Sequence, residues 1–171
     1  MYNQAFDLYH CVYRTLQIIY RFQENERMEI DRVRVWDFYL LFPYKIYDIK
    51  LSRDMVDARK LRKSYVAHIQ SPYEVVDDGR KLLERLRPYQ ESALKTLVSY
   101  GVIDKEELQR NYVKISDRTK LLDIISKLER LSATENNVIS WLNSYFKTVP
   151  MNGRNGLKAK TELLIYRYDG F

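Results

Sequence analysis

The chain has 171 residues, 46% of them hydrophobic and 30% charged, a composition typical of a folded protein of one domain or two small lobes. Its 29 Lys and Arg outnumber its 23 Asp and Glu, giving a formal net charge of +6 that permits contact with nucleic acid or an acidic partner. The single cysteine excludes a disulfide framework and a cysteine-based zinc site.

The first 70 residues are expected to form a helical lobe. Helical spacing of apolar residues predicts one helix from Asp7 to Phe22, a second from Glu29 or Asp31 to Pro43, and a third from Asp54 to Ile69. The second helix is apolar on almost all sides, which predicts that it is buried at the centre of this lobe. Between the second and third helices, the loose alternation of residues 44–51 fits either a short strand or a loop.

The turn signal Ser71-Pro72 is the predicted boundary between a lobe of residues 1–70 and a lobe of residues 71–171. The second lobe is expected to begin with an amphipathic stretch, residues 75–86, that Gly79 interrupts. A new helix is expected to start near Pro88 and to end at Gly101, a residue suited to a helix C-terminus.

The segment after Gly101 predicts a short helix over residues 105–110 and a strand over residues 112–116, an order typical of a winged-helix unit. Further helices are expected after Asp117 and after Ser132 or Thr134, the last one ending before Pro150. Residues 151–160 predict a basic loop, and residues 161–168 a strand. The expected fold class is therefore mainly α with a few short strands (α+β), in two small helical lobes, the second winged-helix-like.

No arrangement of residues predicts catalysis, a cofactor or a metal. His10 and Cys11 are neighbours, so on a helix their side chains point about 100° apart and make a poor nucleophile–base pair. The paired carboxylates at residues 77–78 and 106–107 lie in charged stretches that predict solvated faces. Gly153 and Gly156 precede no phosphate-binding Lys-Ser/Thr. We therefore expect a protein that is not an enzyme.

Two basic clusters are the candidate nucleic-acid contacts. One lies on the third helix and is partly offset by Asp54 and Asp57, so a solvated face is an equally good interpretation. The other lies in the basic loop and is the stronger candidate, because its glycines would let the backbone approach a phosphate. The two clusters are Arg59, Lys60, Arg62 and Lys63, and Arg154, Lys158 and Lys160.

Tyrosine is unusually frequent, with 15 Tyr against 6 Phe and 2 Trp. A ring with a polar tip suits half-buried positions and protein interfaces, and most of these tyrosines are expected to border the core. The candidate partner contacts are Tyr9, Tyr13, Tyr166 and Tyr168. The N-terminus shows no signal-peptide pattern and no apolar run is long enough to span a bilayer, so a cytoplasmic protein without membrane contact is expected.

Three stretches resemble the middle components of bacterial ABC three-component systems, the small partners of Lamassu-type anti-phage defence. They are the aromatic helix of residues 5–16, the helix of residues 30–43 that ends in Asp37-Phe38-Tyr39-Leu40-Leu41-Phe42-Pro43, and the block from Leu86-Arg87-Pro88-Tyr89-Gln90 to Gly101-Val102-Ile103-Asp104. The resemblance covers most of the first 116 residues.

This resemblance implies a non-catalytic subunit of a hetero-oligomer. Its partners would be an ATPase similar to structural-maintenance-of-chromosomes (SMC) or Rad50 proteins and an effector that is often a nuclease. The subunit would bridge the two, help to sense foreign double-stranded DNA without sequence preference, and restrain the effector until DNA arrives.

The alternative is a winged-helix transcriptional regulator, suggested by residues 88–116 and the positive charge. Such a regulator would form a homodimer and insert a recognition helix into the major groove. The helix expected at residues 105–110 carries Glu106 and Glu107, and these carboxylates would repel phosphates. The acidic pair therefore argues against this alternative.

Overall fold

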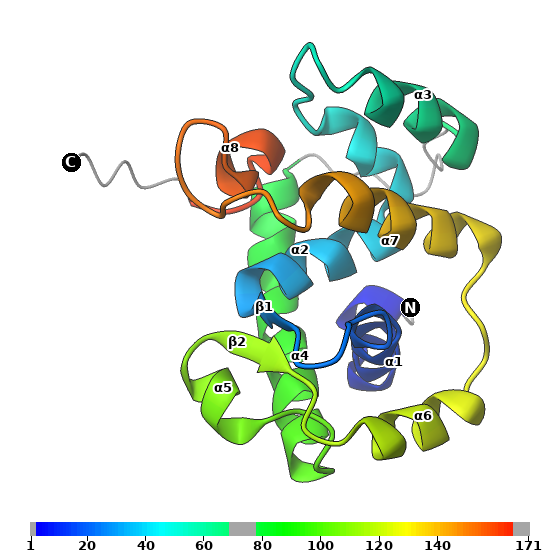
Figure 1. The fold of residues 1–171 in the computed structure, drawn as a ribbon, viewed down its shortest axis with the longest axis vertical. Coiled ribbons are helices and arrows are strands. Elements are labelled where there is room, and N and C mark those ends of the chain that lie inside the picture. Colours follow the sequence, from blue (N-terminus) through cyan, green and yellow to red (C-terminus); the bar gives the residue numbers. More distant parts are fainter. Residues whose placement is uncertain (1–2, 69–77, 166–171) are drawn as a thin grey trace. The chain divides into compact units, whose positions relative to one another are not determined.

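The computed structural model describes residues 3–68 and 78–165 (Figure 1). Within them the chain is mainly helical with one two-stranded antiparallel sheet, which confirms the expected fold class. In chain order the elements are η1 (Gln4–Phe6), α1 (Leu8–Ile19), β1 (Arg27–Glu29), α2 (Ile30–Leu41), η2 (Pro43–Asp48), α3 (Val56–Tyr65), α4 (Gly79–Ser99), α5 (Lys105–Gln109), β2 (Tyr112–Lys114), α6 (Arg118–Ser126), α7 (Ala133–Phe146) and α8 (Leu157–Thr161).

The chain divides into two compact units, each made of two separate segments. Unit 1 comprises Met1–Asp37 and Arg85–Leu131, and unit 2 comprises Phe38–Glu84 and Ser132–Phe171. The divisions fall inside α2 and inside α4. The Ser71-Pro72 turn lies outside the described residues, so the predicted boundary there stays a prediction.

The sheet of unit 1 pairs β1 with β2, and Met28 lies opposite Val113. The sequence predicts β2 and α5, whereas it predicts no strand at residues 27–29. A strand of three residues is too short for an alternation of polar and apolar residues to be recognised. The partner of β2 thus precedes α2 in the chain, and the winged-helix likeness of the segment after Gly101 stays a prediction.

The ends of several unit 1 helices follow from local hydrogen-bonding chemistry. The carboxylates of Asp7, Asp104 and Asp117 each accept a hydrogen bond from the backbone N–H three residues later, at 3.0, 2.9 and 3.0 Å. Each bond satisfies a donor that the first turn of a helix leaves unpaired. Gly101 has a φ of 73° just after α4, in the left-handed region that favours glycine, and this confirms its predicted role at the end of that helix.

A buried polar network crosses the core of unit 1. The carboxylate of Asp37 accepts hydrogen bonds from Arg14 Nε at 2.5 Å and from Gln90 Nε2 at 2.8 Å, and Gln90 Oε1 accepts from Arg34 Nε at 3.0 Å. All four residues are at most 5% exposed. Burial lowers the pKa of Arg14, but the adjacent Asp37 carboxylate more than offsets this effect, so the net shift of the pKa is upward. Arg14 therefore stays charged inside the core.

Unit 2 contains contacts between α3 and α7 and between α7 and η2. The indole of Trp141 on α7 is buried and donates a hydrogen bond from Nε1 to the carbonyl of Ala58 on α3 at 2.9 Å. Ser132 and Glu135 form a reciprocal capping box at the start of α7, which confirms one of the two predicted starts for this helix.

The structure corrects the prediction for residues 44–48, which form neither a strand nor a loop, whereas residues 49–51 are irregular, as the loop alternative predicts. Residues 43–48 form the 3₁₀ helix η2, and Pro43 lies in its first turn. Pro43, Ile46 and Ile49 are spaced three residues apart, and both isoleucines are buried. That spacing matches the three residues per turn of a 3₁₀ helix.

A second correction concerns Pro88, which the sequence places at the start of a new helix. It lies inside α4, which runs without a break from Gly79 to Ser99. Proline removes one backbone hydrogen bond of a helix interior, at a cost of about 3 kcal/mol. Leu83 and Leu86 before it and Ala93 and Leu94 after it are all buried, so side-chain packing on both sides of Pro88 outweighs this cost.

The C-terminal predictions are wrong in two respects. Lys158 and Lys160 lie on the short helix α8 rather than in a loop, and no strand occurs over residues 161–165. Glu162, with a φ of 56°, ends α8 in the left-handed region, and the next residues, Leu163 and Leu164, are both buried. The left-handed conformation of Glu162 interrupts the extended backbone that a strand requires. Residues 166–168 lie outside the described residues.

Candidate interaction site

The basic cluster on α3 divides into two pairs with different roles. The guanidinium of Arg59 donates hydrogen bonds to the carbonyls of Leu51, Ser52 and Arg53, the shortest at 2.7 Å. Lys60 and Lys63 are exposed. Within the described residues, Lys60 and Lys63 are therefore the members of this cluster that are exposed and make no side-chain contact with the rest of the chain.

Arg62 makes a second set of contacts toward η2. Its Nη1 donates to the carbonyls of Ile46 at 3.2 Å and Tyr47 at 3.4 Å, and its guanidinium carbon lies 4.7 Å from the centre of the Tyr47 ring. Partial burial lowers the pKa of Arg62, and its buried Nε has no hydrogen-bond partner in the described part of the chain. Arg59 and Arg62 therefore stabilise unit 2 locally, and their availability to phosphates is reduced.

The second basic cluster is spread over a turn and α8. Arg154 is exposed in the turn that precedes α8, close to Gly153, which has a φ of 94°. Lys158 and Lys160 are half-buried on α8, and the carbonyl of Lys160 accepts a hydrogen bond from the N–H of Lys50 at 2.9 Å. Arg154 is therefore the most accessible member of this cluster.

The candidate partner tyrosines also differ. Tyr9 on α1 is 70% exposed, whereas Tyr13 is half-buried and donates its hydroxyl hydrogen bond to the carbonyl of Glu129 at 2.9 Å. Tyr166 and Tyr168 lie outside the described residues. Tyr9 is thus the described candidate whose ring is open to a partner.

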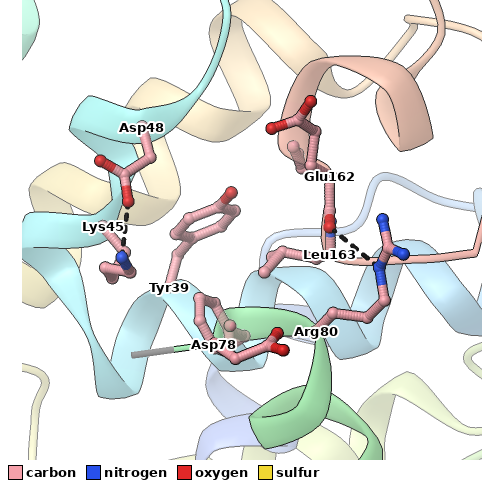
Figure 2. Close-up of a pocket in the computed structure, with 10 residues that line it drawn as sticks. Tyr39, Lys45, Asp48, Asp78, Arg80, Glu162 and Leu163 are labelled. Atoms are coloured by element: carbon pink, nitrogen blue, oxygen red, sulfur yellow. Dashed lines mark hydrogen bonds and ion pairs between the residues drawn. The ribbon is translucent and has the colours of Figure 1, made fainter. Parts of the chain in front are cut away.

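A polar cleft of about 490 Å³ lies wholly within unit 2, and we name it the unit 2 cleft (Figure 2). Three parts of the chain form its walls: the end of α2 with η2, the start of α4, and the segment around the end of α8. The side chains that matter for its chemistry are Tyr39, Lys45, Asp48, Asp78, Arg80 and Glu162.

Most charges around the unit 2 cleft are paired. Asp48 accepts from Lys45 Nζ at 2.6 Å, and Glu162 accepts from Lys50 Nζ at 2.5 Å. Asp78 accepts from the backbone N–H of Lys81 at 3.1 Å, as an acidic residue does at the start of a helix. The carboxylates of the cleft are therefore neutralised locally.

Arg80 is the exception among these charged side chains. Its Nε donates to the carbonyl of Glu162 at 3.4 Å, and it makes no ion pair with the described residues. It is exposed on the first turn of α4, the end of a helix that carries a partial positive charge. The unpaired charge of the cleft is thus positive and lies at the start of α4.

Tyr39 forms part of the cleft floor. It is 1% exposed, and its hydroxyl makes no hydrogen bond to any described residue. Figure 2 shows this hydroxyl pointing into the open space between Asp48 and Glu162. Burial, and secondarily the charge of Asp48, raises the pKa of Tyr39 well above its usual value. The hydroxyl therefore stays protonated and can donate a hydrogen bond to an acceptor.

The groups considered for catalysis lie elsewhere. Cys11 is buried in unit 1, and burial, with a smaller contribution from Asp37, raises the pKa of its thiol to about 12. In residues 3–68 and 78–165, no three His, Cys, Asp or Glu side chains are grouped so that they could hold a metal ion. None of the helices in this part of the chain has the length and apolar character needed to cross a membrane.

Comparison with known proteins identifies the family. Residues 1–169 match the family described as ABC-three component (ABC-3C) system Middle Component 5. The chain belongs to this family. No curated protein and no solved structure matches it. A middle component is an accessory part of a system of several components, so this chain has partners among the other components.

The family membership confirms the predicted resemblance of residues 5–16, 30–43 and 86–104 to middle components of ABC three-component systems, whereas the Lamassu type stays a prediction. The unit 2 cleft was not predicted from the sequence. Tyr39 lies inside the apolar run Phe38–Phe42, where nothing distinguishes it from a core residue, although Asp78-Gly79 before an amphipathic stretch is a recognisable helix start.

Proposed function

We propose that this middle component is a non-catalytic bridging subunit of a bacterial anti-phage defence system, in the cytoplasm. It would connect an SMC- or Rad50-like ATPase to an effector of the nuclease type and assist in sensing foreign double-stranded DNA. The observation that carries this proposal is the family match over residues 1–169. The catalytic steps would then belong to the ATPase and the effector.

The two-unit organisation supports a bridging role, because each unit offers a different surface. Unit 1 presents the exposed ring of Tyr9, an aromatic side chain of the kind enriched at protein interfaces. Unit 2 presents the unit 2 cleft and the accessible Arg154. Two chemically distinct surfaces suit two different partners.

The proposed contact with DNA rests on charge. The chain has a net charge of +6, and the candidate contacts are the basic residues of α3 and of the turn and helix around α8. Contacts of Lys and Arg with phosphates carry no sequence information, which suits a sensor of foreign DNA in general. Of these residues, Lys60, Lys63 and Arg154 are the most exposed in the described part of the chain.

The alternative, a winged-helix regulator, is weakened by the surface of α5. Glu106 and Glu107 lie in the first turn of this helix, and Glu107 is paired with Arg27 of β1 at 3.4 Å. A recognition helix with carboxylates in its first turn would meet the phosphates unfavourably. Sequence-specific binding to one DNA site at physiological salt would favour this alternative.

Co-purification with the products of the neighbouring genes tests the bridging function. A tagged chain co-expressed with them should elute with both an ATPase and an effector in a fixed ratio. Omission of the chain should then separate the ATPase from the effector. A chain that stays alone at micromolar concentration, or an ATPase and effector that associate equally well without it, would contradict the proposal.

A further inference from the structure

The hydroxyl of Tyr39 is an unmatched hydrogen-bond donor at the floor of the unit 2 cleft. The side chain is 1% exposed, and no described residue accepts a hydrogen bond from its hydroxyl. The hydroxyl faces the open space of the cleft, where it can donate a hydrogen bond to water or to a ligand. The first requirement of an occupant is therefore a hydrogen-bond acceptor.

The charges around the cleft indicate that this acceptor is negative. Asp48 is paired with Lys45 and Glu162 with Lys50, whereas Arg80 has no ion pair in the described part of the chain. Arg80 also belongs to the first turn of α4, a helix of 21 residues whose amino end attracts anions. The cleft thus offers an anion one guanidinium without an ion pair and one hydroxyl without an acceptor among the described residues.

The same walls select the kind of anion. Three carboxylates, those of Asp48, Asp78 and Glu162, border the cleft. Although each has its own cation or N–H donor, together they would repel a polyphosphate backbone, which brings one negative charge per nucleotide. An isolated carboxylate brings only one charge, and its two oxygens can each accept a hydrogen bond.

We propose that the unit 2 cleft binds a carboxylate of another component of the system, presented by an Asp or Glu side chain or by a chain end. Tyr39 donates a hydrogen bond from the cleft floor, and Arg80 supplies the opposing charge from the first turn of α4. The identity of the partner as a component of the same system rests on the proposed function. The inference that the cleft binds a carboxylate does not depend on that function.

A probe separates the chemistry of the cleft from the identity of the partner. We would titrate the full chain with the blocked peptide acetyl-Gly-Glu-Gly-amide and follow backbone amide shifts by NMR, using the Gln peptide as the matched ligand. Wild type should bind the Glu peptide in the millimolar range and move amides near the start of α4. Equal shifts with the Gln peptide, or no shift up to 20 mM, would overturn the proposal.

Two variants assign the donors. Tyr39→Phe removes only the hydroxyl, and Arg80→Gln removes the charge; each should weaken binding of the Glu peptide about 10-fold, as expected for a hydrogen bond to a charged group. Arg87→Gln is the control, because Arg87 is an exposed arginine of α4 that is paired with Glu91 and lies outside the cleft. Unchanged affinity for Tyr39→Phe, or an equal loss for Arg87→Gln, would overturn the assignment.

Competition and co-purification complete the test. A short DNA duplex that displaces the Glu peptide from wild type would reassign the cleft to phosphate and overturn the carboxylate proposal. In co-purification, Tyr39→Phe should release one component that Arg87→Gln retains. A wild-type chain without partners would instead count against the proposed function, whereas a complex that Tyr39→Phe leaves intact would count against a partner carboxylate in this cleft.

Discussion

The two units use similar side chains in opposite ways. In unit 1 the carboxylate of Asp37 is enclosed in the core, where Arg14 and Gln90 satisfy both of its oxygens. In unit 2 the carboxylate of Asp48 is on the rim of a cleft, and the hydroxyl of Tyr39, which faces the same cleft, has no acceptor among the described residues. A network that is closed on itself specifies a fold, whereas one that is left open provides a place for a ligand.

The largest expected effect concerns the two carboxylates. Asp37→Asn should lower the free energy of unfolding by about 3–5 kcal/mol, because it leaves the Arg14 guanidinium buried without its counter-charge. Asp48→Asn should cost less than about 1 kcal/mol, because the Asp48 side chain is 62% exposed. Urea unfolding of both variants gives the comparison. Equal losses would remove the distinction between a closed and an open network.

The second expected effect is on DNA affinity and tests whether unit 2 carries the DNA contact. Reversing the charges in Arg154→Glu, Lys158→Glu and Lys160→Glu should weaken binding to a DNA duplex and lower the slope of log Kd against log salt by up to about three. Titration of the duplex at several salt concentrations measures both quantities.

The control is the same change of charge in unit 1, at the exposed positions Lys95→Glu, Lys105→Glu and Arg130→Glu. These reversals should lower affinity less, through the net charge alone. A salt slope that the unit 2 reversals leave unchanged would exclude those three residues as phosphate contacts.

The third effect concerns the burial of Cys11 in the core of unit 1. Its folded pKa of about 12 lies above the ordinary value of 9.0, so the thiol stabilises the fold fully below about pH 9 and loses this contribution as the pH rises toward 12. At pH 10 the loss amounts to about 1 kcal/mol. The difference in the pH dependence of unfolding between wild type and Cys11→Ala isolates it.

Thiol reactivity gives an independent measure of how well the core of unit 1 protects Cys11. Ellman's reagent should leave Cys11 unmodified in the native protein at pH 8 and modify it fully in urea, because the native thiol is both buried and protonated. Rapid modification of the native protein would show that unit 1 opens readily.

The smallest expected effect comes from removing one hydroxyl in each unit. Tyr13→Phe should cost about 0.5–1.5 kcal/mol, because the hydroxyl of Tyr13 donates to the carbonyl of Glu129. Tyr39→Phe should change the stability by less than about 0.5 kcal/mol, since no bond to a described residue is lost. Thermal melts of the two variants suffice. A larger loss for Tyr39→Phe than for Tyr13→Phe would show that its hydroxyl is already satisfied.

Much of the fold follows from local chemistry that is visible in the sequence. Asp117 before α6, Ser132 before α7 and Gly101 after α4 mark helix ends, and these features were predicted. Asp104 caps α5 by the same chemistry. The errors occur where distant contacts decide. Pro88 stays helical because of packing on both sides, and Glu162 turns the chain away from a strand.

The functional surfaces were harder to predict for the same reason. Tyr39 and Arg80 are far apart in the sequence and line the same cleft only in the folded unit 2. The basic residues of α3 look alike in the sequence, yet Arg59 and Arg62 bind carbonyl groups of the preceding segment while Lys60 and Lys63 stay exposed. Family membership was predictable because it depends on the order of whole blocks rather than on a few contacts.

The alternation of the two units along the chain has a consequence for synthesis. Residues 1–37 leave the ribosome before 85–131, with a segment of unit 2 between them, so neither unit has all of its chain until residue 131 has been made. Until then the buried residues of α2 that belong to unit 1, such as Val33 and Trp36, lack the second segment of that unit. A nascent chain paused before residue 85 should therefore be a substrate for chaperones, one paused after residue 131 should keep the part of that affinity that comes from unit 2, and the complete chain should lose it.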